Sequence, residues 1–193
     1  MTSSISESWT RIEAWLAQHT PRTFAALDPP AERSAIAVAE QAIGQPFPEP
    51  LVESLLRHNG MGHRDLLPPF WSLLGVEGIT SAWQTRMKIY GDVLAGAEEG
   101  DPDGEYGPWW HAQWIPIAYN GGGDDLIMDM RPYRRRGRIG KADHETGCSF
   151  SPNPMWASLP ALLDAKATAL ETGEAVDGYL PVAVDEDELD WDF

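Results

Sequence analysis

Three aspartates lie close together in the middle of the chain, at Asp124, Asp125 and Asp129. Carboxylate oxygens at this density can hold a hard cation such as Ca²⁺ or Mg²⁺. Their spacing does not match an EF-hand loop, and glycine-rich connections commonly carry Asn and Asp because these residues suit turns. In a strand that starts at Asp125, alternation places Asp125 and Asp129 on one face and leaves Asp124 in the turn. Turn chemistry is therefore favoured, and a cation-binding or hydrolytic domain that also uses His144 stays an alternative.

Other residues with chemical potential lack the neighbours that a reaction needs. His144-Glu145 resembles the start of a zinc-binding helix, but no second histidine follows at the required spacing. The segment 137–142 has a glycine and a lysine but no full phosphate-binding loop. Cys148 lies four residues after His144 across a predicted turn, which favours a small buried thiol over a nucleophile. No G-x-S-x-G or H-E-x-x-H motif occurs either. We therefore predict no catalytic residue, no metal site, no cofactor and no enzymatic activity.

The chain contains nine tryptophans among 193 residues. Tryptophan is costly to leave in water, so these side chains either build the core or line a concave binding surface. Three of them lie on or beside predicted helices, where core packing is expected: Trp9, Trp83 and Trp156. Four others lie in or beside predicted strands: Trp71, Trp109, Trp110 and Trp114. We expect these four to supply apolar contacts to a partner, with core packing as the alternative.

The charge balance restricts the class of partner. Thirty acidic residues face 14 basic ones, which makes a formal net charge of −16. Nucleic acids and anionic membranes bind through Lys and Arg, so neither is expected as a partner. An acidic surface instead favours capture of a basic protein. The predicted loop 95–108 contributes Glu98, Glu99 and Asp101 to such a surface, and we expect it to be exposed and mobile.

Apolar periodicity predicts the helices that precede and follow these residues. Ser4 to Glu7 reads as a capping box that opens a helix over residues 5–19. A second helix is expected to start within Asp28–Ala31, after a linker, and to end at Gly44. Further helices are expected from residue 51 to Asn59-Gly60, across residues 79–94, and from Ser158 to Gly173.

Strands are expected at 110–119 and 126–130, joined by a tight hairpin connection over 120–125. Two more short strands are expected at 138–142 and 149–151, after a basic turn at 131–138, and an edge strand near 66–74. Strands that follow one another through short turns pair antiparallel, so the predicted class is α+β. Its N-terminal helices precede a central, mainly antiparallel sheet with an inserted helix, and a C-terminal helix follows.

The composition suits a single domain over residues 1–173. Residues 174–193 are an acidic C-terminal tail, expected to be partly disordered or docked, whose carboxylates pair with the basic turn Arg134–Arg136 as one possibility. No apolar run approaches the roughly 18 residues that span a bilayer. The first residues show no export signal, and one cysteine excludes an intramolecular disulfide, so a cytoplasmic location is expected.

Several segments occur in an order that resembles the SUKH superfamily, which groups a yeast cell-wall synthesis regulator with many bacterial proteins. The segments are Trp9…Leu16, Leu27-Asp28-Pro29-Pro30-Ala31, Ile43-Gly44…Phe47-Pro48, His58-Asn59-Gly60, Trp114-Ile115-Pro116-Ile117-Ala118, Gly122-Gly123-Asp124, Met128-Asp129 and Gly137…Gly140. The resemblance spans about residues 5–172. Its best parts are the Asn-Gly after a helix and the stretch from Trp114 to Asp129.

The resemblance implies an α+β domain with a concave binding face and without catalysis. Many bacterial members are similar to immunity proteins that block toxins, and an acidic plug complements the basic cleft of a nuclease toxin. We therefore expect a non-enzymatic protein-binding domain that neutralises a cognate toxin, with a regulatory scaffold like the yeast member as the alternative. The expected contact residues are Trp71, Trp109, Trp110, Trp114, Asp124, Asp129, Glu98, Glu99 and Asp101.

Overall fold

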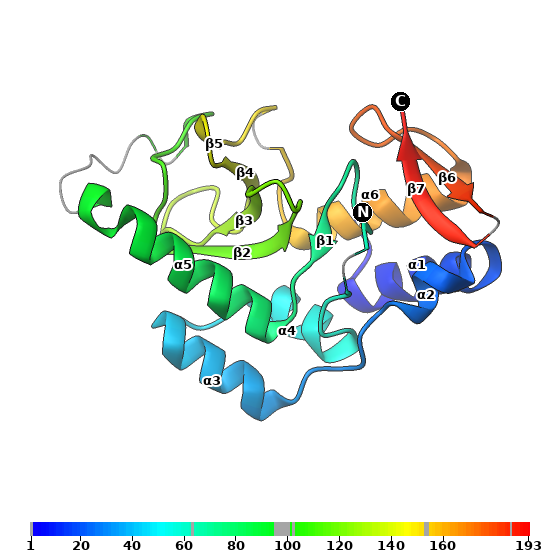
Figure 1. Ribbon diagram of the computed structural model, residues 1–193, viewed down its shortest axis with the longest axis horizontal. Helices are drawn as coiled ribbons and strands as arrows, with labels where there is room; N and C mark the ends of the chain where they lie inside the picture. Colours follow the sequence, from blue (N-terminus) through cyan, green and yellow to red (C-terminus); the bar gives the residue numbers. More distant parts are fainter. Residues whose placement is uncertain (1, 63, 95–100, 102, 153–154, 186) are drawn as a thin grey trace.

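Figure 1 presents the computed structural model, which describes residues 2–62, 64–94, 101, 103–152, 155–185 and 187–193. In chain order the elements are α1 (Ile5–His19), α2 (Pro21–Ala25), α3 (Arg33–Ile43), α4 (Glu49–Arg57), β1 (Ser72–Leu73), α5 (Val76–Leu94), β2 (Trp114–Tyr119), β3 (Asp125–Asp129), β4 (Ile139–Asp143), β5 (Gly147–Ser149), α6 (Leu159–Thr172), β6 (Leu180–Val184) and β7 (Glu188–Asp192). The predicted α+β class is confirmed. Within the described residues, no helix is both long enough and apolar enough to cross a bilayer.

Helix α1 begins where the sequence predicts. Ser4 Oγ accepts a hydrogen bond from the Glu7 amide, and the Glu7 carboxylate accepts one from the Ser4 amide at 2.8 Å. This capping box satisfies amides that the start of a helix leaves without partners. The buried stripe of the helix comprises Ile5, Trp9, Ile12 and Leu16. Through this stripe α1 packs against α4 and α6.

Two expectations for the next segment are wrong. Residues 21–25 form α2 instead of a linker, because their first residue is a proline, whose fixed φ and missing amide suit a first helical turn. Helix α3 then starts at Arg33 and not within Asp28–Ala31. In that segment the first amide donates to Gly60 O and the last donates to Leu55 O. Its backbone therefore pairs with α4 and the turn behind α4 instead of forming a helix.

Strands β1 to β5 form one antiparallel sheet in which each strand pairs with the next along the chain. Every residue of the central strand β3 is buried. Leu126 and Met128 face a large core built with the helices, whereas Ile127 faces a smaller core. Helix α5 packs on β2 and contributes side chains to both cores. Both faces of the sheet are therefore covered at β3.

The segment expected as an acidic tail forms a β-hairpin, in which β6 pairs with β7 (Figure 1). Leu189 and Trp191 of β7 are buried, and the amide of Leu189 donates to Thr23 Oγ1 at 2.8 Å. The Trp191 ring lies against Lys166 of α6. The hairpin is thus seated on α2 and α6 by apolar and polar contacts together.

Ion pairs also hold the turn that joins β6 to β7. Glu188 pairs with Arg22 at 2.8 Å and with Arg64 at 2.5 Å, and Asp187 also pairs with Arg22. These two acids of the hairpin therefore meet arginines from the N-terminal third of the chain, not the basic turn Arg134–Arg136 that the sequence pointed to as one possible partner.

Candidate functional site

The three aspartates of the central cluster do not share one site. Asp125 forms an ion pair with Arg86 of α5 at 2.6 Å. Asp129 pairs with two arginines that follow β3, and Asp124 pairs with His144 after β4. Each carboxylate thus has cationic partners of its own. The residues alternate along β3 as predicted, but tertiary partners separate their chemistry.

Asp129 is a core residue and not a surface contact. It is 3% exposed, and Arg131 Nη2 lies 2.7 Å from its Oδ2. Arg138, which is equally buried, approaches the same oxygen at 3.5 Å and stacks over Phe150. Buried charges persist in proteins when they are paired in this way. The expectation that Asp129 contacts a partner is therefore corrected: the carboxylate neutralises buried guanidinium groups.

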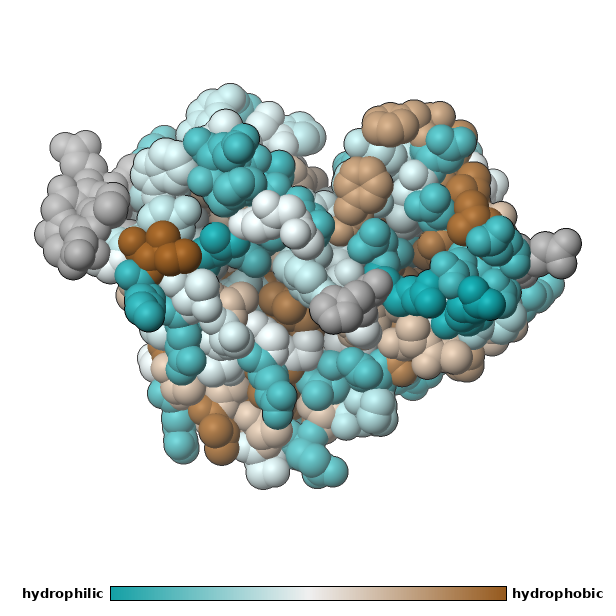
Figure 2. Space-filling view, viewed as in Figure 1, coloured by the Kyte–Doolittle hydropathy of each residue, from teal (hydrophilic) through white to brown (hydrophobic). Residues whose placement is uncertain are grey.

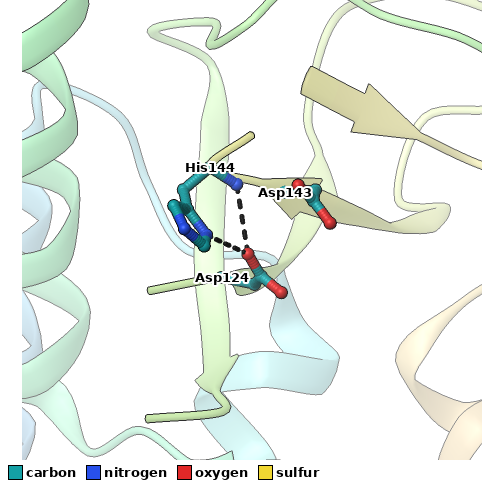
Figure 3. Close-up of side chains that lie close together, drawn as sticks. All are labelled: Asp124, Asp143 and His144. Atoms are coloured by element: carbon teal, nitrogen blue, oxygen red, sulfur yellow. Dashed lines mark hydrogen bonds and ion pairs between the residues drawn. The ribbon is translucent and has the colours of Figure 1, made fainter. Parts of the chain in front are cut away.

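The carboxylate of Asp124 has four polar contacts, and Figure 3 shows those with His144. Its Oδ1 accepts hydrogen bonds from the His144 ring at 2.8 Å and from the His144 amide at 3.1 Å. Its Oδ2 accepts from Asn120 at 2.9 Å and lies 3.2 Å from Lys141 Nζ. Burial by itself would raise the pKa of Asp124, but these hydrogen bonds outweigh it and hold the pKa below its ordinary value.

Asp124, Asp143 and His144 bring potential metal ligands within 4.8 Å of one another. The ammonium of Lys141 already lies there, 2.8 Å from Asp143 and 3.2 Å from Asp124. A cation would have to displace this lysine and the hydrogen bond between His144 and Asp124. The arrangement therefore acts as an ion-pair clasp between β3 and β4, and we do not propose a metal site there.

Cys148 belongs to the smaller core. It is 3% exposed, and burial raises the pKa of its thiol well above the ordinary value. In the sheet it pairs with Ala142, and His144 lies beyond that strand's end with its ring on Asp124. A thiol without ionisation is a poor nucleophile. This geometry agrees with the interpretation of Cys148 as a packing residue.

Three of the four tryptophans expected at the surface are buried: Trp71, which is 7% exposed and belongs to the large core, Trp110 and Trp114. Trp110 and Trp114 are both 0% exposed, and their rings pack edge to face at 5.8 Å between centroids. Trp114 also meets Phe150 edge to face. Both rings belong to the smaller core, which also contains Ile127 of β3 and against which side chains of α5 pack. Their expected role as partner contacts is therefore corrected to core packing.

Trp109 is the one of the four that lies well exposed, with 43% of its surface accessible. Its ring stacks on Tyr90 of α5, and nearby in the chain Tyr106 is 71% exposed. Asp101 is exposed as well, and its carboxylate accepts a hydrogen bond from the Asp103 amide. Glu98 and Glu99 lie outside the described residues, as does half of the loop 95–108 that was expected to be exposed and mobile.

Trp71 lines an open cleft of about 620 Å³ together with its neighbour Phe70. Trp71 itself is 7% exposed and forms part of the floor, whereas Phe70 is 52% exposed. Among the described residues, the lining comprises Pro68–Trp71, Asn120, Lys141, Pro152, Met155 and Asp177. Figure 2 shows a hollow between the lobe that carries β3–β5 and the lobe that carries the C-terminal hairpin. Most of the lining is apolar, and Lys141 links it to the clasp around Asp124.

Sequence reasoning missed Phe70, Lys141 and Asp177 as cleft residues. For Asp177 a local signal existed, because an Asp-Gly pair between two β-forming residues is a strong hairpin signal. Asp177 and Gly178 have φ values of 52° and 86°, and the flanking residues exchange two backbone hydrogen bonds. This tight turn presents the aspartate at the cleft. We interpreted residues 174–193 by their acidity and did not use this turn signal.

One family model matches the chain. It is that of the SMI1 / KNR4 family (SUKH-1), and it covers residues 30–165. The match includes α3 to β5 and the first half of α6, with every cleft residue except Asp177. Among curated proteins, none matches the sequence significantly.

Proposed function

The chain belongs to the SMI1 / KNR4 family (SUKH-1), and from this premise we propose that it is a non-enzymatic domain that binds and neutralises a cognate toxin protein. One observation carries the proposal: the open cleft has an aromatic floor and a mostly apolar lining, with Phe70 half exposed to water. An apolar concavity of this kind is typical of a site that receives side chains of a partner.

The charge of the chain supports a basic partner. A net charge of −16 accelerates encounter with a cationic surface and repels anionic ones. A toxin that degrades nucleic acid needs a basic cleft to hold phosphates. An acidic immunity protein would compete for that surface through complementary potential.

The state of the polar residues supports binding instead of catalysis. In the described part of the chain, the carboxylates of Asp124, Asp125 and Asp129 are each engaged by a cationic side chain. General acids and bases need a pKa close to the working pH and room for a substrate. The buried thiol of Cys148 meets neither requirement, because its pKa is raised and it is enclosed in the smaller core.

The test is neutralisation of a toxic protein, and the product of the adjacent gene is the candidate to assay first. We expect cells that express this candidate to survive only when this chain is co-expressed, and the two purified proteins to bind in calorimetry. Phe70→Ala should weaken binding roughly tenfold, because a phenylalanine that becomes buried contributes about 1.5–3 kcal/mol. Phe24→Ala, which removes a ring of similar exposure (39%) on α2, is the matched control.

Two results would contradict the proposal. Survival that is unchanged by co-expression would exclude neutralisation of that toxin, and binding of a partner with no toxic activity would favour the regulatory scaffold instead. Equal loss of affinity in Phe70→Ala and Phe24→Ala would remove the cleft from the interface.

A further inference from the structure

The cleft has walls from two separate parts of the chain. Phe70, Trp71 and Lys141 belong to the segment that the family model matches, whereas Asp177 follows α6 and lies outside it. Figure 2 shows the hollow between the lobe of the sheet and the lobe of the C-terminal hairpin. The turn between α6 and β6, which carries Asp177, therefore completes a cleft that the matched part of the chain leaves open on one side.

The β6–β7 hairpin, which follows the turn that carries Asp177, is fastened to the rest of the fold. Trp191 lies over Lys166, with 3.4 Å between the ammonium nitrogen and the ring centroid. The Arg22 amide donates to Asp187 O at 3.0 Å, and Glu188 pairs with Arg22 and Arg64. A site is selective when its contacts are held in place before the ligand arrives. The turn that carries Asp177 leads directly into this fastened hairpin, so Asp177 can act as a specificity residue and not as part of a loose tail.

The charges at the cleft are not balanced. The ammonium of Lys141 is neutralised by Asp124 and Asp143, at 3.2 and 2.8 Å. The carboxylate of Asp177 receives a hydrogen bond from Trp156, which is a neutral donor. The tight turn leaves Asp177 exposed at the cleft. The cleft therefore offers one negative charge beside an apolar floor.

We propose that the cleft binds an extended segment of a protein partner in which a large apolar side chain lies next to Lys or Arg. The apolar side chain packs on Phe70 and Trp71, and its cationic neighbour pairs with Asp177. This inference rests on the proposed function as a protein-binding domain, and it names the chemistry that the cleft selects. Asp177, which lies in the turn before β6 and outside the matched family segment, then decides the preference for a cation.

The test uses three blocked hexapeptides that differ only at the two central positions of Gly-Ser-x-x-Ser-Gly: Trp-Arg, Trp-Glu and Ala-Arg. Amide shifts of the full-length protein are followed by NMR during titration. We expect Trp-Arg to bind with shifts around Phe70, Lys141 and Asp177. Trp-Glu should bind about three- to fivefold more weakly, as expected for one partly exposed charge pair. Ala-Arg should bind about tenfold more weakly, because the apolar contact is lost.

A conservative pair of variants isolates the aspartate. Asp177→Asn keeps a residue that tolerates the left-handed turn, so the hairpin should stay folded. It should reduce the preference for Trp-Arg over Trp-Glu to less than about twofold. Asp192→Asn removes an exposed carboxylate of the same hairpin that does not line the cleft, and the preference should persist.

The inference is overturned if the three peptides bind alike, if none binds, or if the shifts lie away from the cleft. It is also overturned if the two variants lose the preference equally. None of these results touches neutralisation of the candidate toxin, which is measured with the intact partner. If the chain neutralises its toxin but does not bind the peptides, the proposed function stands and this inference is refuted.

Discussion

The ammonium nitrogen of Lys166 lies 3.4 Å from the centroid of the Trp191 ring, and Lys166 is only 1% exposed. Lys166 belongs to α6 and Trp191 to β7, so this one contact joins the C-terminal hairpin to the helix beneath it. Among the described residues, no hydrogen-bond acceptor reaches the amine. Burial therefore lowers the pKa of Lys166 well below its ordinary value. The stability of the hairpin and the protonation of this lysine are linked.

Replacement of Trp191 should weaken the packing of the β6–β7 hairpin against α6. We expect Trp191→Ala to lower the free energy of unfolding by about 3 kcal/mol, because truncation of a buried aromatic side chain leaves a cavity. Urea titration followed by circular dichroism measures the change. Phe193→Ala is the control, since Phe193 is 84% exposed and its loss should cost less than about 0.5 kcal/mol. Equal effects of the two variants would contradict a seating role for Trp191.

Replacement of the lysine should change how stability depends on pH. The folded chain disfavours the proton that Lys166 carries when unfolded, so this residue costs stability at neutral pH. The cost fades as the pH rises from the lowered folded pKa towards about 10.4, the ordinary value for lysine. Lys166→Met should therefore unfold at a higher temperature than the wild type at pH 7. Its advantage should shrink by up to about 1.4 kcal/mol per pH unit on the way to pH 10.

Thermal unfolding of both proteins between pH 6 and pH 10 measures this difference. Lys88→Met, which removes an exposed lysine of α5, should leave the pH profile unchanged. A constant difference between Lys166→Met and the wild type across the range would mean that Lys166 stays protonated in the fold.

The clasp between His144 and Asp124 should make part of the stability depend on pH in the opposite direction. The hydrogen bond to Asp124 raises the pKa of His144. The contribution of the protonated ring is then complete below the unfolded value of about 6.5 and is lost as the pH rises through the folded pKa. His144→Gln should destabilise the protein more at pH 5.5 than at pH 8.5.

Titration of the imidazole signal by NMR provides a direct check of this clasp. In Asp124→Asn the pKa of His144 should fall, because the partner loses its charge, whereas Asp101→Asn should leave it unchanged. An unaltered pKa of His144 in Asp124→Asn would show that the ion pair does not form in solution.

Gly140 of β4 should tolerate no side chain. A β-carbon there would collide with Cδ1 of Phe150 and lie 2.6 Å from its Cε1 and 2.8 Å from Ser149 O. Overpacking of this kind typically costs about 1–3 kcal/mol, so we expect Gly140→Ala to lower the free energy of unfolding by about 3 kcal/mol. Gly62→Ala is the matched control in the same denaturation assay, because a β-carbon at Gly62 would meet no atom within 4 Å among the described residues. A Gly140→Ala variant as stable as Gly62→Ala would refute the packing of Phe150 on β4.

Local patterns were sufficient for the elements whose stabilising partners lie nearby in the sequence. In α1, the residues of the capping box and those of the apolar stripe follow one another at intervals of three or four positions. These local patterns predicted the extent of the helix correctly. The serine cap and the left-handed glycine that bound α6 acted in the same way. By contrast, the start of α3 could not be read from Asp28–Ala31, because its amides bond to a helix that comes later in the chain.

The roles of the candidate site residues depended on partners far along the chain. Asp125 meets Arg86, 39 residues earlier, and Trp191 meets Lys166, 25 positions earlier. Trp109 and Trp110 are adjacent in the sequence, yet one is exposed and the other is wholly buried. Trp110 packs against Trp114 in the smaller core, whereas Trp109 stacks on Tyr90 at the surface, and only these tertiary contacts distinguish two neighbouring residues of the same type.

The sequence by itself determined the α+β class, the capped helices, the antiparallel strands and the acidic charge, because periodicity, capping and turn residues act over a few positions. Tertiary structure decided which carboxylates are neutralised, which tryptophans are buried, and that the acidic C-terminal segment closes one side of a cleft. Those outcomes depend on contacts between residues that lie far apart in the chain, whose free energy is only gained once the backbone has brought them together.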